Sequence, residues 1–119
     1  MTVQRSVGLR GEETAANYLD ARGYEIRGRN VRVGPHDEID ILAYDRRDGV
    51  LVFVEVKARS HADGSFRPEM NAGFRKRERM KRAARLWIAE HGYEGGYRID
   101  LLSVVGSSVV AHFCELSWE

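Results

Sequence analysis

The spacing of hydrophobic residues predicts two amphipathic helices. Residues 6–22 place apolar and small side chains at helical intervals, and Gly23 follows them as a stop signal. Residues 72–91 do the same at the spacing i, i+3, i+4, i+7, i+8 and are followed by Gly92. The second stripe consists of Met80, Ala83, Ala84, Trp87 and Ile88. Each helix therefore has one face suited to packing on a sheet.

A period of two residues predicts the strands. The expected strands are 24–33, 38–44, 51–59, 97–105 and 108–114. A short polar loop ending at Gly49 should join the second and third as an antiparallel hairpin. Residues 60–72 show no sustained period, so a mobile loop is expected there. The order helix, three strands, helix, two strands predicts an α/β fold: a single domain over residues 1–119, with a mixed central sheet of about five strands flanked by helices.

The composition is that of a soluble globular protein. Of 119 residues, 43% are apolar and 31% are charged, which excludes a disordered or fibrous chain. The longest apolar stretch, residues 50–54, is far shorter than a membrane span, and the first residues lack the apolar core of a signal peptide. We therefore expect a cytoplasmic protein with no membrane partner. The one cysteine, Cys114, has no evident base nearby, which favours a buried reduced thiol over a catalytic one.

Acidic and basic residues interrupt two otherwise apolar strands, and the hairpin count places them opposite one another. With residues 46–49 as the loop, counting outward sets Asp40 opposite Glu55. The same count sets Glu38 opposite Lys57. Directly opposed residues on one face have Cβ atoms about 4.5–5.5 Å apart, so the two carboxylates can share one divalent ion.

The opposed acids favour a metal-dependent site. Without a cation, Asp40 and Glu55 would repel each other across the strands. Their oxygens, with the Val56 carbonyl as a further ligand, suit Mg²⁺ or Mn²⁺. Zinc is not expected, because neither paired cysteines nor a His-x-x-x-His spacing is present. Lys57, on the same face as Glu55, can orient or deprotonate an attacking water or stabilise charge on a phosphate, which suits phosphodiester hydrolysis.

Cross-strand salt bridges on a solvated face are the alternative interpretation of the same charges. Glu38 and Lys57 can form such a bridge. However, Leu42, Leu51 and Phe53 share the face with these residues, which puts the charges at the polar end of a buried surface. The apolar residues on the same face favour the functional interpretation.

Both predicted helices add charge near this site. Glu12 lies at the edge of the first apolar stripe, so it is the acid expected to point inward. Residues 75–85 hold seven Lys and Arg residues against one acid, and Lys76 lies one turn before the second stripe, where it should point along the sheet. The candidates for nucleic-acid contact are Arg59, Arg75, Lys76, Arg79 and Arg82. A solvated face is the ordinary alternative for such a run, and Arg59 can instead neutralise the carboxylates.

The histidine and tryptophan residues indicate no second site. The four histidines, His36, His61, His91 and His112, are scattered and are interpreted as surface or loop residues. Trp87 lies on the core stripe and is expected to pack. Trp118 can pack, stack on a base or anchor a subunit contact.

Two signature segments resemble those of one bacterial family. They are Glu38-Ile39-Asp40-Ile41-Leu42 and Val52-Phe53-Val54-Glu55-Val56-Lys57-x-Arg59. Further matching segments, in order, are Gly8-x-x-Gly11-Glu12-x-x-Ala15-x-x-Tyr18-Leu19, Gly23-Tyr24, Arg29-Asn30, Lys76 and Arg98-Ile99-Asp100. With these segments the chain resembles, over most of its length, the YraN-like family of uncharacterised bacterial proteins. That family is placed in the restriction-endonuclease-like superfamily with its Asp…Glu-x-Lys signature.

The resemblance implies a restriction-endonuclease-like core, PD-(D/E)xK, similar to that of archaeal Holliday-junction resolvases. It implies that Asp40 and Glu55 are metal ligands and that Lys57 is the catalytic lysine. Glu12 would be an accessory acid. The superfamily supplies a chemistry and not a substrate.

Two positions depart from the family pattern. Glycine is usual where this chain has Asp37, and also after the loop phenylalanine, where this chain has Arg67. In a regular strand the side chains of Asp37 and Asp40 point to opposite faces of the sheet. They would share a face only if the strand began with a bulge. The two changes leave the signature residues in place but alter the expected loop conformation and substrate entry.

Three hypotheses follow. The leading one is a Mg²⁺- or Mn²⁺-dependent endonuclease acting on DNA, with branched structures among the candidate substrates. A homodimer is plausible because resolvase-like enzymes cut two strands. The second hypothesis is a nucleic-acid-binding or adaptor module that keeps the nuclease fold with little or no hydrolysis. The third is a structural interaction domain, in which Glu38, Asp40, Glu55 and Lys57 form salt bridges.

Overall fold

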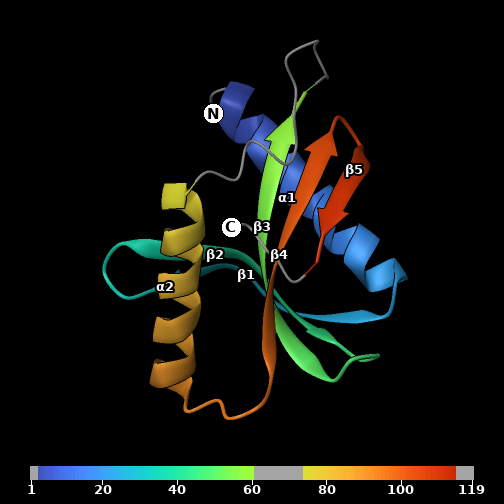
Figure 1. Ribbon diagram of the computed structural model, residues 1–119. Coiled ribbons are helices and arrows are strands. Elements are labelled where there is room, and N and C mark those ends of the chain that lie inside the picture. The colour runs from blue at the N-terminus through green and yellow to red at the C-terminus, as the bar shows by residue number, and fades with distance from the viewer. Residues whose placement is uncertain (1–2, 61–73, 115–119) are drawn as a thin grey trace.

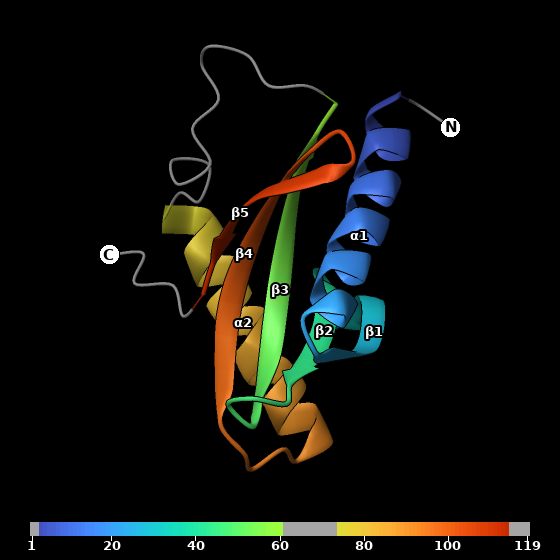
Figure 2. The ribbon, with the colours of Figure 1, turned by 90° about the vertical axis from the view of Figure 1, so that its right-hand side faces the viewer.

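Two helices cover opposite faces of one five-stranded sheet (Figures 1 and 2). The computed structural model describes residues 3–60 and 74–114. The elements are α1 (Val3–Ala21), β1 (Tyr24–Val33), β2 (Asp37–Asp45), β3 (Val50–Arg59), α2 (Phe74–His91), β4 (Tyr97–Val105) and β5 (Ser108–Phe113). This order confirms the α/β prediction. The loop expected at 60–72 lies, apart from residue 60, outside the described residues.

The sheet is mixed because of one crossover. Its strand order is β1-β2-β3-β4-β5, and neighbouring strands are antiparallel except β3 and β4, which are parallel. Parallel neighbours need a long connection, and here that connection contains α2. It carries α2 to the face opposite α1 (Figure 2).

Each face of the sheet has its own apolar core. On the α1 side, the strands contribute Ile41, Ala43, Val52, Val54, Leu102 and Val104. On the α2 side, they contribute Val33, Ile39, Leu42, Leu51 and Phe53. Trp87 of α2 contacts Phe53 edge-to-face at 5.8 Å, which confirms its packing role. Neither helix in the described ranges is apolar enough over a sufficient length to cross a membrane.

The alternation of β2 breaks at Asp40. Ile39 packs on the α2 side and Ile41 on the α1 side, whereas regular alternation would place both on one side. In the ladder with β1, Arg29 pairs with Ile41 and Val31 with Ile39, so the intervening Asp40 has no pairing partner there. This irregularity separates the start of β2 from its regular second half.

The predicted hairpin register is confirmed only for that second half. The ladder between β2 and β3 runs from Asp45 opposite Val50 to Ile41 opposite Val54. It stops one step before the expected pair of Asp40 and Glu55. The regular ladder is replaced by a side-chain contact, because the Val56 backbone N–H donates to the Asp40 carboxylate at 2.9 Å.

A close helix–strand approach fixes α1 beside the end of β3. A Cβ placed on Gly11 would lie 2.4 Å from the Ala58 Cβ, closer than side chains tolerate. Only glycine therefore allows this approach. The contact positions Glu12, the next residue of α1, beside the irregular region of β2 and β3.

Candidate active site

Three carboxyl groups from three elements converge at the break in β2. Asp40 comes from β2, Glu55 from β3 and Glu12 from α1. Burial, the largest cause, and the neighbouring carboxylates of Glu55 and Glu12 together raise the pKa of Asp40 to about 8, against the lowering effect of the Val56 N–H. A carboxyl in this position favours a proton or another cation.

Glu12 completes the acidic group from the helix side. Its Oε1 atom is buried and has no hydrogen-bond partner within the described residues. Burial raises the pKa of Glu12, as do Glu38 and Glu55, while a hydrogen bond with Asn30 and the charge of Arg29 lower it. Asn30 adopts the left-handed backbone conformation, with φ of 51°, which asparagine tolerates better than most residues. Sequence reasoning did not identify this support for Glu12.

Two cations of α2 lie against Glu55. The Lys76 Nζ is 3.1 Å and the Arg79 Nη2 3.4 Å from the same oxygen, Glu55 Oε1. Lys76 points toward the sheet, as its place before the apolar stripe indicated. Both residues were predicted to contact nucleic acid. In this structure their charges instead offset that of a buried carboxylate.

Lys57 lies in the same region without a carboxylate partner of its own. Its side chain is half-buried and forms no ion pair among the residues that the structure describes. Burial lowers the pKa of Lys57, and the nearby charges of Lys76 and Arg59 lower it further, with Glu55 acting in the opposite direction. A lysine with a lowered pKa is better suited to exchange a proton near neutral pH.

The expected pairing of Glu38 with Lys57 is wrong. Glu38 belongs to the part of β2 that pairs with β1, where it lies opposite Arg32. It is exposed, and its charge raises the pKa of Glu12. The break at Asp40 is the reason. The prediction assumed that side chains alternate regularly between the two faces of the sheet, and the break reverses this alternation before Asp40.

Asp37 is part of a different ion pair. Its two carboxylate oxygens accept hydrogen bonds from Arg82 Nη2 at 2.7 Å and Arg82 Nε at 2.9 Å. Asp37 is 5% exposed, and hydrogen bonding to Arg82 lowers its pKa. The pair ties the start of β2 to α2. Arg82 is therefore paired with Asp37. Arg75, on the same helix, is exposed. Arg67 lies outside the described residues.

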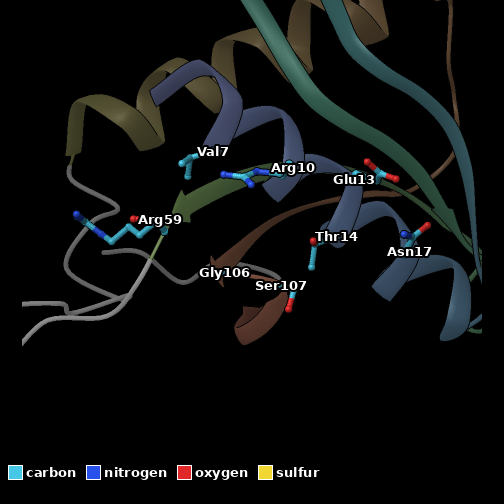
Figure 3. Close-up of a pocket in the computed structure, with 9 residues that line it drawn as sticks. Val7, Arg10, Glu13, Thr14, Asn17, Arg59, Gly106 and Ser107 are labelled. Carbon is cyan, nitrogen blue, oxygen red and sulfur yellow. The ribbon is translucent and has the colours of Figure 1, made fainter. Parts of the chain in front are cut away.

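Arg59 lies at the end of β3, beside an open polar pocket of about 450 Å³. The pocket lies between α1 and the β4–β5 turn and is lined also by Arg10, Thr14, Asn17 and Ser107 (Figure 3). Arg10 and Arg59 bring two cations to its rim. The pocket does not include Asp40 or Glu55, so it neighbours the acidic group without containing it.

The structure contains a second polar cluster that the sequence did not predict. Arg98 donates to both oxygens of Asp100, at 2.8 and 3.0 Å, and to Asp45 at 3.0 Å. His112 was interpreted as a surface or loop residue, but its side chain is only 12% exposed and contacts Asp100. Cys114, expected to be buried, is exposed. The signal for this cluster was the Arg-x-Asp pair on one face of an apolar strand.

The chain matches proteins of one family along most of its length. The model of "Uncharacterised protein family UPF0102" matches residues 11–104. A UPF0102 protein of Parafrankia sp. (strain EAN1pec) is 45% identical over 105 residues, which cover 87% of this chain and 86% of that protein. One of Streptomyces coelicolor is 42% identical over 120 residues, covering 94% of this chain and 88% of that protein. These matches confirm the resemblance to the YraN-like family: the chain belongs to the uncharacterised protein family UPF0102.

Proposed function

We propose that this protein is a metal-dependent endonuclease that hydrolyses phosphodiester bonds in DNA, with branched structures among its candidate substrates. The observation that carries the proposal is the convergence of Glu12, Asp40 and Glu55 beside Lys57. The likeness of these residues to the Asp…Glu-x-Lys signature supports the same chemistry by analogy.

The acidic group fits Mg²⁺ or Mn²⁺. The donors are oxygen atoms, which both ions prefer, and the Glu12 Oε1 atom is buried without a hydrogen-bond partner in the described ranges. The raised pKa of Asp40 marks a place where negative charge lacks a sufficient counterion. Asp40, Glu55 and the Val56 carbonyl would hold the ion, which when bound supplies a Lewis acid for the phosphoryl group. Glu12 would support it as an accessory acid.

The residues around the ion site have separate tasks in this proposal. Lys57, whose pKa is lowered, holds or moves a proton at its Nζ or stabilises charge on the phosphate. An ion on Glu55 would compete with Lys76 and Arg79 for the same carboxylate. The two α2 cations would then be available for the phosphates of the nucleic acid, as the exposed Arg75 already is.

A cleavage assay tests the proposal. The purified protein is incubated with branched, single-stranded and duplex DNA in Mn²⁺ or Mg²⁺. We expect cleavage by the wild type and its loss in Glu55→Gln. Glu25→Gln is a matched control, because Glu25 is an exposed acid on β1. Equal cleavage by the wild type and Glu55→Gln would contradict the proposed site.

Lys57→Ala separates chemistry from ion binding. If Lys57 acts on the reacting groups, the variant should lose cleavage while its affinity for Mn²⁺ stays within a few-fold of the wild type. Lys81→Ala is the control, because Lys81 is a half-exposed α2 lysine paired with Glu78 at 3.5 Å. A variant that loses Mn²⁺ affinity and cleavage together would instead place Lys57 in ion binding.

A binding or adaptor module with little hydrolysis is the second candidate. The observation in its favour is that Lys76 and Arg79 already offset the charge of Glu55. In that case calorimetry would detect salt-dependent DNA binding and no uptake of Mn²⁺. Size-exclusion chromatography with light scattering would test the homodimer that cleavage of two strands suggests.

A further inference from the structure

A second set of metal-binding side chains lies on the α1 side of the sheet, apart from the acidic group. Asp100 comes from β4, His112 from β5, and Cys114 follows the end of β5. One oxygen, one nitrogen and one sulfur atom of these residues all lie within 4.8 Å of one another. They therefore form a compact group of three different donors.

The β4–β5 ladder explains why they meet. Leu101 pairs with Phe113 and Leu102 with His112, and one more step along this register sets Asp100 opposite Cys114. Residues directly opposite each other in an antiparallel pair have Cβ atoms about 4.5–5.5 Å apart. His112 and Cys114 are two residues apart, so they share a face. Asp100 and His112 thus lie in neighbouring strands, and Cys114 directly follows β5.

The surroundings of His112 resemble those of a metal-binding imidazole. Its Nε2 faces Asp100 Oδ2 at 2.8 Å, and its Nδ1 lies 3.0 Å from the Tyr18 hydroxyl. A hydroxyl can both donate and accept, so Tyr18 supports the ring whichever nitrogen carries the proton. Such a partner on the other ring nitrogen is what orients metal-binding histidines.

The positive charge of Arg98 does not exclude a cation, because several acids share it. Besides Asp100, the guanidinium contacts Asp45 at 3.0 Å and Asp48 at 3.1 Å, and it donates to the Tyr24 hydroxyl at 2.8 Å. If an oxygen of Asp100 turned to an ion, Arg98 would keep these partners. The group is also accessible, since Cys114 lines an open cavity of about 510 Å³ together with Tyr24 and Arg98.

We propose that Asp100, His112 and Cys114 form a second metal site, which takes Zn²⁺ through one oxygen, one nitrogen and one sulfur donor. Mixed sulfur and nitrogen donors select zinc over magnesium. Three protein ligands leave a fourth position for a water or for a ligand that enters from the cavity. The ion replaces the proton of the Cys114 thiol, which passes to the solvent, and it fastens the edge strand β5 to β4 (Figure 1).

Cobalt spectroscopy tests the proposal with a signal that the acidic group cannot give. The metal-free, reduced protein is titrated with Co²⁺, and the near-ultraviolet thiolate-to-cobalt band is measured. Cys114 is the one cysteine in the chain, so the band identifies it. We expect the band in the wild type and in Glu55→Gln, and its loss in Cys114→Ser. Displacement of Co²⁺ by Zn²⁺ should abolish it.

Zinc affinity and stoichiometry complete the test. Cys114→Ser and His112→Ala should each weaken Zn²⁺ binding by at least about tenfold, and native mass spectrometry of Glu55→Gln, in which the acidic group is impaired, should find one zinc ion per chain. Since His112→Ala also removes the contact with Tyr18, the fold of this variant is checked by circular dichroism. If His112→Ala is unfolded, the zinc affinity of Cys114→Ser alone decides the test. Absence of the band in the wild type, its persistence in Cys114→Ser, or one ion shared by two chains would overturn the proposal.

Discussion

The backbone N–H of Val56 donates to the carboxylate of Asp40 at 2.9 Å, where the β2–β3 ladder would otherwise continue. A side chain thus takes the place of a backbone acceptor. This holds Asp40 at the edge of the core, next to Glu55, although burial and the charge of Glu55 raise the pKa of Asp40 to about 8. The position is tolerated because the carboxyl accepts the Val56 N–H and its raised pKa favours the uncharged form.

Asp40→Asn should separate stability from function. The asparagine oxygen still accepts the N–H of Val56, and the charge repulsion with Glu55 disappears. We expect the metal-free variant to melt no lower than the wild type at pH 8, and cleavage to fall by at least about 100-fold. Asp20→Asn, at an exposed position of α1, is the control and should change neither. A variant that unfolds at pH 8 would contradict this account of Asp40.

The stability of the metal-free protein should fall between about pH 4 and pH 8 on account of Asp40. Its pKa rises from an ordinary 3.8 to about 8 on folding, so the folded state holds the proton more tightly than the unfolded state. The contribution of Asp40 is complete below the unfolded pKa and is lost as the pH rises through the folded one. Chemical denaturation at several pH values measures this. The difference between the wild type and Asp40→Asn should grow over this window, and a constant difference would refute the assignment.

Gly11 should be intolerant of a side chain, unlike a neighbouring glycine of the same helix. A Cβ on Gly11 would lie 2.4 Å from the Ala58 Cβ, whereas one on Gly8 would meet nothing within 4 Å. We expect Gly11→Ala to destabilise by about 1–3 kcal/mol through overpacking. Gly8→Ala should be neutral or stabilising. Adding Ala58→Gly to Gly11→Ala should recover part of the loss, and no recovery would argue against this contact.

The sequence predicted the regular part of the fold well because regular elements have local signals. The predicted bounds of β1 and β4 are those observed, and the hairpin register is correct from Asp45 to Ile41. These features depend on alternation and on a short polar loop, both visible in the chain. The first helix, expected at 6–22, spans Val3–Ala21, and the second, expected at 72–91, spans Phe74–His91 in the described residues.

The irregular part of the site could not be predicted in the same way. The break at Asp40 coincides with a left-handed Asn30 in the neighbouring strand and with a side-chain bond to Val56, and neither has a periodic signal. The prediction from regular strand alternation was therefore wrong for Glu38. Likewise, the Arg-x-Asp spacing marks Arg98 and Asp100, but their partners Asp45 and Tyr24 are distant in the chain, so spacing could not show those contacts.

Asp37 and Arg82 should be energetically coupled. Arg82→Ala leaves the carboxylate of Asp37 buried without its bidentate partner, so the melting temperature should fall more than in Arg85→Ala, an exposed position of the same helix. Asp37→Gly combined with Arg82→Ala should lose less than the sum of the two changes. Thermal unfolding of the four variants measures this coupling. Additive losses would show that the pair contributes nothing in solution.

The pH dependence of the same pair has the opposite sign to that of Asp40. Hydrogen bonding to Arg82 lowers the pKa of Asp37 on folding, so the unfolded state binds the proton more tightly. Its contribution is present above the ordinary pKa of 3.8 and is lost as the pH falls through the folded value. In Asp37→Gly, the acid-induced loss of stability should be smaller than in the wild type. An unchanged acid transition would contradict this role.

Arg98 should be the most sensitive arginine in the described part of the chain. Arg98→Met removes the charge that faces Asp100, which is fully buried, and Asp45, and breaking a buried pair costs about 3–5 kcal/mol. Asp100→Asn should cost less, because Arg98 keeps its bonds to Asp45 and Tyr24. Arg27→Met, in an exposed pair with Glu25, is the control and should change little. Urea denaturation measures all three, and an Arg98→Met variant as stable as Arg27→Met would mean that the buried network does not form.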